Sequence, residues 1–153
     1  MKILLLDLQD QGDAWVANGL RNAFPEDSLH VEGDVGAVRD PFASDRLAPD
    51  LVILCDEDTD RLLGAYAVLA ASATLPATIA LTASPSVDAA VCLLRAGIDD
   101  LHVLDVGNTW QRQLPRVVEG LLQRLHDKEA RRGHDEALRA SQQYLAQIID
   151  GSS

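Results

Sequence analysis

Four side chains able to do chemistry stand at the ends of short apolar runs that have the pattern of buried strands. They are Asp7, Cys55, Asp56 and Thr82, at or just after the ends of the runs 2–7, 50–55 and 77–82. The carboxyl ends of parallel strands meet at one edge of a sheet, so Asp7, Cys55 and Thr82 are expected on a shared rim. A carboxylate there can bind a cation or accept a phosphoryl group, and a thiol can act as a nucleophile when it ionises.

Each of these groups also has a purely structural interpretation. Asp7 fits a strand-end acid bonded to loop amides better than a metal ligand. Thr82 fits a structural hydroxyl, and Cys55 fits a small buried apolar residue, because no cation near it in the sequence would lower the pKa of its thiol. The acidic run 56–60 is interpreted as a solvated loop, unless the strand bulges and turns Asp56 onto the rim.

The elements that must position these groups follow a regular order. Short apolar runs alternate with helical patterns, which favours βαβ units and a parallel sheet covered on both faces. Five strands and five helices predict the flavodoxin-like α/β fold, a doubly wound five-stranded sheet in the order 2-1-3-4-5. The strands are expected at 2–7, 28–31, 50–55, 77–82 and 101–104, and the helices at 13–24, 60–72, 86–96 and from 109 onward, with a weakly patterned helix within 33–48.

Helix ends carry further signals. Ser84 and Pro85 are expected to cap and begin the fourth helix, and Gly97 to end it. Asn108 or Thr109 is expected to cap the fifth helix. The two tryptophans, Trp15 and Trp110, are interpreted as packing residues, with a partner contact as the alternative for Trp110.

The last helix carries an apolar seam with the spacing of a coiled coil. Its residues are Leu114, Val118, Leu121 and Leu125. The first two turns of this face are expected to cover the chain's own sheet. The seam fails over the polar stretch 126–136, so a helix with a break in phase and two helices joined by a hinge both fit. We therefore expect one domain over 1–125 and a helical extension over 126–153.

Composition limits the class of partner. The formal net charge is -11, and residues 1–108 hold 18 acidic against 6 basic side chains. Such a field repels phosphate backbones and anionic lipid, so binding to nucleic acid or a membrane surface is not expected. The apolar stretch 63–83 is interpreted as a helix and a strand, because Pro76 interrupts it. With two cysteines in apolar runs and an acid too early for a signal peptide, a cytoplasmic protein is expected.

Over residues 1–125 the chain resembles the receiver domains of bacterial response regulators, the CheY-like family. The resemblance rests on the first strand with its leading acid, the run 49–54 of the third strand, Leu81-Thr82-Ala83, and Ala96-Gly97-Ile98-Asp99-Asp100 before the fifth strand. It implies an acid pair after the first strand, a phosphate-accepting aspartate after the third, a hydroxyl after the fourth and a lysine after the fifth, around Mg²⁺.

This chain departs from the receiver pattern at the residues that would carry out phosphoryl transfer. Cys55 occupies the acceptor position, Leu8 follows Asp7 where a second acid would stand, and Leu104 occupies the lysine position. Thr82 keeps the hydroxyl. The resemblance therefore implies a pseudo-receiver that is not phosphorylated, is no enzyme and uses no cofactor. It would act by protein–protein contacts within a two-component or cyclic-di-GMP signalling protein.

Association is expected through the side of the fourth and fifth helices and through the long helix, whose seam would join two copies as a homodimer. Residues 136–150 resemble the helical lead-in to a PAS sensor domain, which implies a further domain as partner. Two alternatives stay open. One is a receiver phosphorylated on Asp56, with Asp7 and Asp56 as a weak Mg²⁺ site. The other is a small flavodoxin-like ligand-binding domain or enzyme, although no glycine-rich loop follows the first strand.

Overall fold

A computed structural model describes residues 1–9, 15–37, 48–71, 75–83, 85–105, 107 and 109–151, with side chains described as far as residue 130. The chain divides into two compact units, Met1–Val118 and Glu119–Ser153. The predicted division into a domain over 1–125 and a helical extension over 126–153 stays a prediction.

Five parallel strands form one sheet in the order β2-β1-β3-β4-β5, which confirms the predicted doubly wound topology. The strands are β1 (Lys2–Asp7), β2 (Ser28–Glu32), β3 (Leu51–Cys55), β4 (Ala77–Thr82) and β5 (Asp100–Val103). The bounds of β1 and β4 agree with the prediction, and the other three strands differ from it by one residue at their ends, where pairing is weakest. β2 and β5 are the edge strands.

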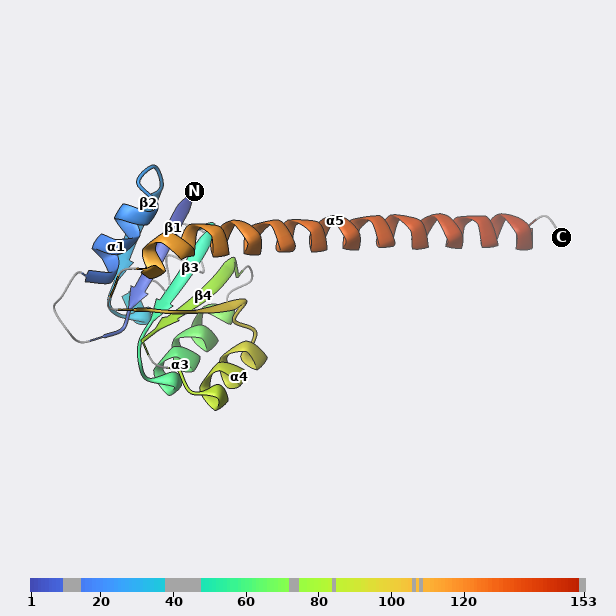
Figure 1. Cartoon of the computed structure of the whole chain (residues 1–153). Helices are drawn as coiled ribbons and strands as arrows, with labels where there is room; N and C mark the ends of the chain where they lie inside the picture. The colour runs from blue at the N-terminus through green and yellow to red at the C-terminus, as the bar shows by residue number, and fades with distance from the viewer. Residues whose placement is uncertain are drawn as a thin grey trace. The chain divides into compact units, whose positions relative to one another are not determined.

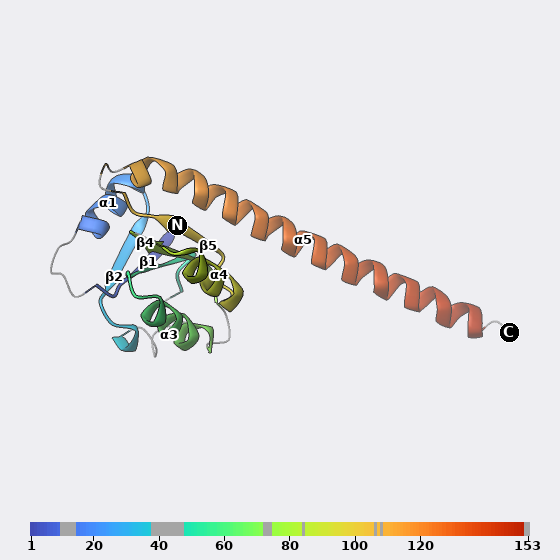
Figure 2. The same cartoon turned by 60° about the horizontal axis from the view of Figure 1, so that its bottom comes forward.

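Helices cover both faces of the sheet. Figures 1 and 2 show α3 (Thr59–Ala70) and α4 (Val87–Ala96) on one face, and α1 (Trp15–Ala23) with the first turns of α5 (Thr109–Gly151) on the other. Most of the helix predicted within 33–48 lies outside the described residues, as do residues 13, 14 and 72 at the ends of other predicted helices. The stretch 63–83 supplies the end of α3 and β4, as predicted, and no described helix is long and apolar enough to cross a membrane.

The core has two layers because successive strand side chains point to opposite faces. The layer under α3 and α4 joins Leu4, Leu6, Val52, Leu54, Leu62, Leu69, Ala80, Leu93 and Ile98. By this alternation, Asp7 and Cys55 belong to the opposite face, which α1 and the start of α5 cover. The central strand β3 is buried over its whole length.

The start of α4 differs from the prediction. Ser86 caps the helix, since its backbone is extended and its hydroxyl accepts a hydrogen bond from the amide of Ala89 at 3.0 Å. The predicted start at Pro85 is therefore wrong, and Ser84 lies outside the described residues. Gly97 ends the helix with φ 113°, which confirms the predicted left-handed glycine.

The first amides of α5 are held by a residue that sequence reasoning missed. The two carboxylate oxygens of Asp105 accept hydrogen bonds from the amides of Thr109, at 3.1 Å, and Trp110, at 2.7 Å. Asn108, one of the two predicted caps, lies outside the described residues. Asp105 follows Leu104, the residue at the lysine position of the receiver pattern, and its carboxylate organises the turn into α5.

The seam of α5 is divided between the inside and the outside of the chain. Leu114 and Val118 are buried, as expected for the first two turns, and Leu121 is buried as well. The seam that these residues were expected to form between two copies stays a prediction. Leu125 is half-buried. The backbone is helical throughout 126–136, so of the two alternatives the structure has the continuous helix with a break in phase.

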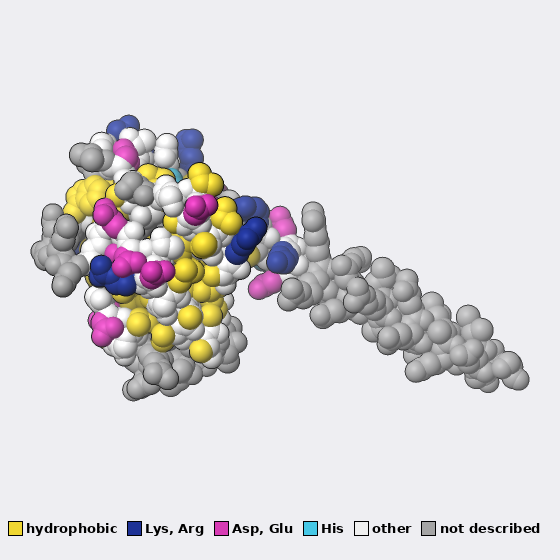
Figure 3. All heavy atoms as spheres, turned by 90° about the horizontal axis from the view of Figure 1, so that it is seen from below, with side chains coloured by type: hydrophobic (Ala, Val, Ile, Leu, Met, Phe, Trp, Pro, Cys, Tyr) yellow, Lys and Arg dark blue, Asp and Glu magenta, His cyan; other side chains and the backbone are white. Residues whose placement is uncertain are grey.

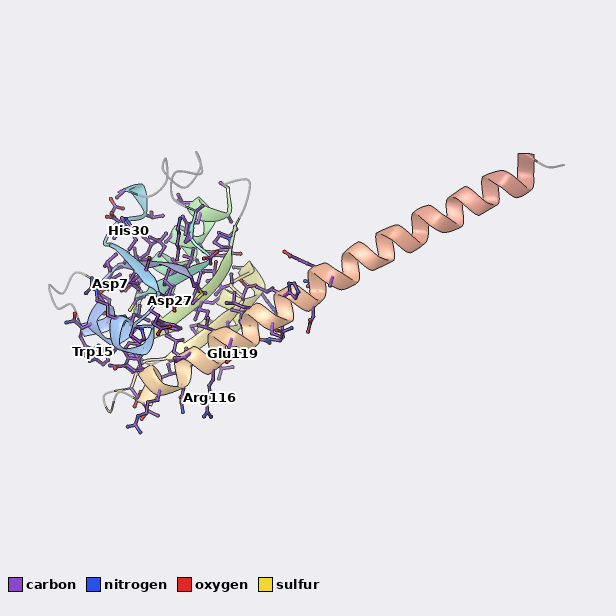
Figure 4. The ribbon with its side chains drawn as sticks, turned by 90° about the horizontal axis from the view of Figure 1, so that it is seen from above. Asp7, Trp15, Asp27, His30, Arg116 and Glu119 are labelled. Atoms are coloured by element: carbon purple, nitrogen blue, oxygen red, sulfur yellow. The ribbon has the colours of Figure 1, made fainter. Side chains whose placement is uncertain are left out.

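α1 and α5 pack through a glycine and two tryptophans. Trp110 is fully buried and meets Trp15, labelled in Figure 4, edge to face, with ring centroids 5.7 Å apart. A Cβ atom on Gly19 would lie 2.5 Å from two ring carbons of Trp110. Only the absence of a side chain allows this approach, so Gly19 sets the spacing of the two helices.

We expect Gly19→Ala to lower the free energy of unfolding by about 1–3 kcal/mol, because the new methyl group overlaps the Trp110 ring. Gly64→Ala in α3 is the matched control, since no atom lies within 4 Å of its Cβ position. That substitution should raise the free energy of unfolding by up to about 1 kcal/mol through helix propensity. Urea denaturation measures both, and equal effects would contradict the packing role of Gly19.

Candidate functional site

The strand ends bring the predicted groups to one rim. Asp7 pairs in register with Cys55, and Cys55 pairs with Leu81, the neighbour of Thr82. The amide of Asp56 donates a hydrogen bond to the carbonyl of Leu81 at 3.3 Å, which continues the ladder one residue beyond β3. Two acids, a thiol and a hydroxyl therefore lie on neighbouring strands.

The thiol of Cys55 is buried and un-ionised, so it is not available as a nucleophile. Its side chain is fully buried, and burial raises the pKa of Cys55 to about 12, with a further contribution from the negative charges of Asp7, Asp56 and Glu57. A thiol with this pKa stays protonated near neutral pH and is a poor nucleophile. Its environment agrees with the interpretation of Cys55 as a small buried apolar residue.

Asp56 is an anchor of the β3–α3 loop. It is only 2% exposed, so the interpretation of the acidic run as solvated is wrong for this residue and right for Glu57, Asp58 and Asp60. Its Oδ1 accepts hydrogen bonds from the amides of Glu57, at 2.7 Å, and Asp58, at 3.2 Å. These bonds stabilise the turn that follows β3.

Arg61 supplies the counter-charge to Asp56. Its Nε lies 3.3 Å from Oδ2 of Asp56 and 3.4 Å from Oδ2 of Asp58. The contact to Asp56 is an ion pair without hydrogen-bond alignment, and this buried oxygen has no hydrogen-bond partner among the described residues. Asp58 also caps α3, through a bond from the amide of Asp60 at 2.9 Å. Sequence reasoning missed Arg61, although its i,i+3 spacing from Asp58 at a helix start was a usable signal.

Asp7 behaves as a strand-end acid. Its Oδ1 accepts a hydrogen bond from the amide of Gln9 at 3.3 Å, as the structural interpretation expected. Burial, assisted by the nearby charge of Asp56, raises the pKa of Asp7, and the bond from Gln9 opposes this only in part. A raised pKa means that the protein does not supply positive charge around this carboxylate.

The remaining receiver positions are packing positions. Leu8 is half-buried and packs against the core under α3 and α4, and Leu104 is 5% exposed. The amide of Leu104 donates to the carbonyl of Thr82 at 2.9 Å, and Thr82 is itself buried. Where the receiver pattern has a second acid and a lysine, this chain therefore has apolar side chains.

A metal site finds little support in this arrangement. Within the described ranges, no three histidine, cysteine or acidic side chains gather closely enough to hold a metal ion. The weak candidate formed by Asp7 and Asp56 offers two carboxylates, one of which Arg61 already neutralises.

Removal of the Arg61 charge tests its role. We expect Arg61→Gln to lower the free energy of unfolding by about 1–2 kcal/mol, because it leaves a buried carboxylate without a counter-charge; the exposure of Arg61 keeps the effect below that of a fully buried pair. In an Asp56→Asn background the same substitution should cost less than about 0.5 kcal/mol. Arg112→Gln, at an exposed position on α5, is the control. An equal cost in both backgrounds would show that Arg61 acts independently of Asp56.

Comparison with known proteins gives fold neighbours. The chain matches no protein-family profile, and no curated protein matches it significantly in sequence. Among solved structures, the pilus assembly protein CpaE from Caulobacter crescentus CB15 has 19% identity and a TM-score of 0.60, with coverage of 78% of this chain and 98% of that one. The CheY-like protein TadZ from Pseudomonas aeruginosa PAO1 has 11% identity and a TM-score of 0.60, with coverage of 79% and 98%. A two-component response regulator from Clostridium difficile has 20% identity and a TM-score of 0.58, with coverage of 82% and 98%.

The chain has the CheY-like receiver fold. These neighbours match it over nearly their full length, and the strand order of this chain is the one predicted, which confirms the predicted fold. At such low identity the likeness concerns the fold, so the chemistry of this receiver-like domain has to be argued from its own rim.

Proposed function

We propose that this receiver-like domain is a signalling module that is not phosphorylated and acts by protein–protein contacts. The observation that carries the proposal is the buried Cys55 thiol in the place of the phosphate-accepting carboxylate. Its pKa of about 12 keeps it neutral, so it cannot replace that carboxylate as a nucleophile.

The neighbouring acid is a poor substitute. Asp56 is buried, and its Oδ1 is engaged by two loop amides. Attack on a phosphoryl donor would require this carboxylate to leave those bonds and the Arg61 contact. Leu104 provides no ammonium group to stabilise the charge of a phosphoryl adduct.

Treatment with acetyl phosphate, or with beryllofluoride and Mg²⁺, tests this proposal. We expect no covalent adduct by intact-mass analysis and no beryllofluoride binding by fluorine NMR. A stoichiometric adduct that disappears in Asp56→Asn would overturn the proposal and establish Asp56 as an acceptor. Cys55→Asp, which restores the carboxylate, tests whether the acceptor is the missing part or the surrounding charges are missing too.

We further propose that the long helix takes part in association between copies. α5 runs to Gly151, and the side chains of residues 126–130 are exposed. Helices of this length in water are normally stabilised by packing against another element. Apolar residues recur beyond the polar stretch, at Leu138, Leu145 and Ile149, which supports a helical partner for this part of the chain. The link to a PAS domain and to a larger signalling protein belongs to the same proposal.

Light scattering of the full chain and of a chain ending at residue 125 tests association through the helix. We expect a dimer mass for the full chain at micromolar concentration and a lower average mass for the shortened one, because the apolar positions beyond residue 136 are removed. Circular dichroism of the shortened chain checks that the domain remains folded. A monomer in both cases would refute this mode of association.

A further inference from the structure

His102 places a titratable ring on the face of the sheet that the start of α5 covers. Its neighbour on β5, Leu101, packs against the core under α3 and α4. Successive strand side chains point to opposite faces, so the ring of His102 belongs to the face covered by α1 and the first turns of α5 (Figure 1). The function proposed above makes no use of this residue.

The buried nitrogen of this ring has no partner. Nε2 of His102 is buried, and no hydrogen-bond partner lies near it within the part of the chain that the structure describes. A neutral imidazole tolerates this, because its proton can stand on Nδ1 and leave a lone pair at Nε2. A protonated ring carries N–H groups on both nitrogens, so it places a charge and a donor without an acceptor under the helix. The surroundings of Nε2 therefore oppose protonation.

The row of side chains beside His102 carries no charge close to the ring. It crosses the sheet through Leu81 and the neutral thiol of Cys55 to Asp7, three strands away and thus about 14 Å distant. The buried side chains of α1 and α5 are uncharged as well. The charged side chains of these two helices as far as residue 118 are exposed to solvent; they are Arg21, Arg112 and Arg116.

Two acids do act on the ring. Asp100 lies two residues earlier on β5, and Asp105 lies in the turn into α5. Burial lowers the pKa of His102 below its ordinary value of 6.5, and the negative charges of Asp100 and Asp105 oppose this only in part. Inside the fold the ring is therefore neutral at neutral pH.

Asp105 connects His102 to the attachment of α5. Its carboxylate accepts the hydrogen bonds from the amides of Thr109 and Trp110 that begin the helix. Desolvation opposes ionisation of Asp105, but the bonds from Trp110 and Thr109 outweigh it and hold the pKa of this carboxyl below its ordinary value. Asp105 thus stays charged in the weakly acidic range. A protonated His102 reaches a favourable environment only by moving towards water or towards Asp105, and either movement disturbs the first turn of α5.

We propose that His102 makes the attachment of α5 sensitive to pH, so that protonation of its ring loosens the first turns of the helix from the sheet. The inference rests on the proposed function as an interaction module, because α5 is the element proposed to associate, and it adds a means of regulation. Its sign follows from linkage. A ring released from the sheet binds a proton more readily than the buried ring, so the attached state loses stability as the pH falls below about 6.5 and keeps it above that value.

The two tryptophans report on this attachment in the full chain. Trp15 and Trp110 are the chain's two tryptophans, and their rings meet where α1 packs on the start of α5. Acrylamide quenching of their fluorescence therefore measures access to this contact. We expect the quenching constant of the wild type to rise about twofold or more between about pH 7.5 and 5.5, the range in which histidine gains its charge.

Replacement of the ring tests whether His102 causes this response. His102→Gln and His102→Phe remove the titrating group, and each should leave the quenching constant unchanged over the same range. The phenylalanine ring also fills the space of the imidazole, and circular dichroism at neutral pH checks that both variants are folded. His126→Gln, at an exposed position of α5, is the matched control and should keep the wild-type response.

The opposite side of the domain is not expected to contribute to the signal. Neither α3 nor α4 contains a histidine. Figure 3 looks onto the side that these helices form and shows hydrophobic and acidic side chains gathered there. Proton NMR of the histidine rings gives a second, independent measurement, in which His102 should titrate below its ordinary value of 6.5.

Three results would overturn the inference: a quenching constant of the wild type that does not change with pH, an equal rise in the wild type and the His102 variants, or a His102 ring that titrates at 6.5 or above. These results are separate from those that test the proposed function. An adduct on Asp56 would end the proposed lack of phosphorylation and leave the pH response standing, while a flat response would leave the chemistry of the rim unchanged.

Discussion

Complete burial of the central strand is the constraint on which the rest of the site depends. All five residues of β3 are buried, so the side chain at its end must tolerate the loss of water. An ionised carboxylate tolerates it only with cations or donors around it. Cys55 needs neither, and the apolar Leu8 and Leu104 beside this rim are consistent with that. The three departures from the receiver pattern thus form one change, in which a charged cluster is replaced by packing.

Asp56, a buried acid next to β3, is stabilised by contacts within its own loop. Two amides and Arg61 surround Asp56, and Arg61 also contacts Asp58, which caps α3. The loop therefore links the end of the strand to the start of the helix through partners that are permanent parts of the chain. In a phosphorylated receiver, the resemblance implies that the end of the third strand instead holds a metal ion and a phosphoryl group that is added and removed. A fixed loop fits a module whose output depends on what binds its surfaces.

Those surfaces are formed where the fold leaves apolar side chains uncovered. The face under α1 and the start of α5 is closed by the fit between Gly19 and Trp110. On the other face α4 buries Leu93 and leaves an exposed stripe on an otherwise acidic domain.

The fold and the rim could be predicted from the sequence, because both depend on local patterns. Apolar runs at the right spacing predicted five strands in their observed order, and the strand ends placed Asp7, Cys55 and Thr82 at the same edge of the sheet. The tertiary structure decided what those patterns could not contain. It placed Asp56 inside the loop beside Arg61, assigned the turn into α5 to Asp105, and buried the side chains of Leu114 and Val118. The reason is that burial and ion pairing depend on which segments meet in space, and the spacing of residues along one segment does not specify that.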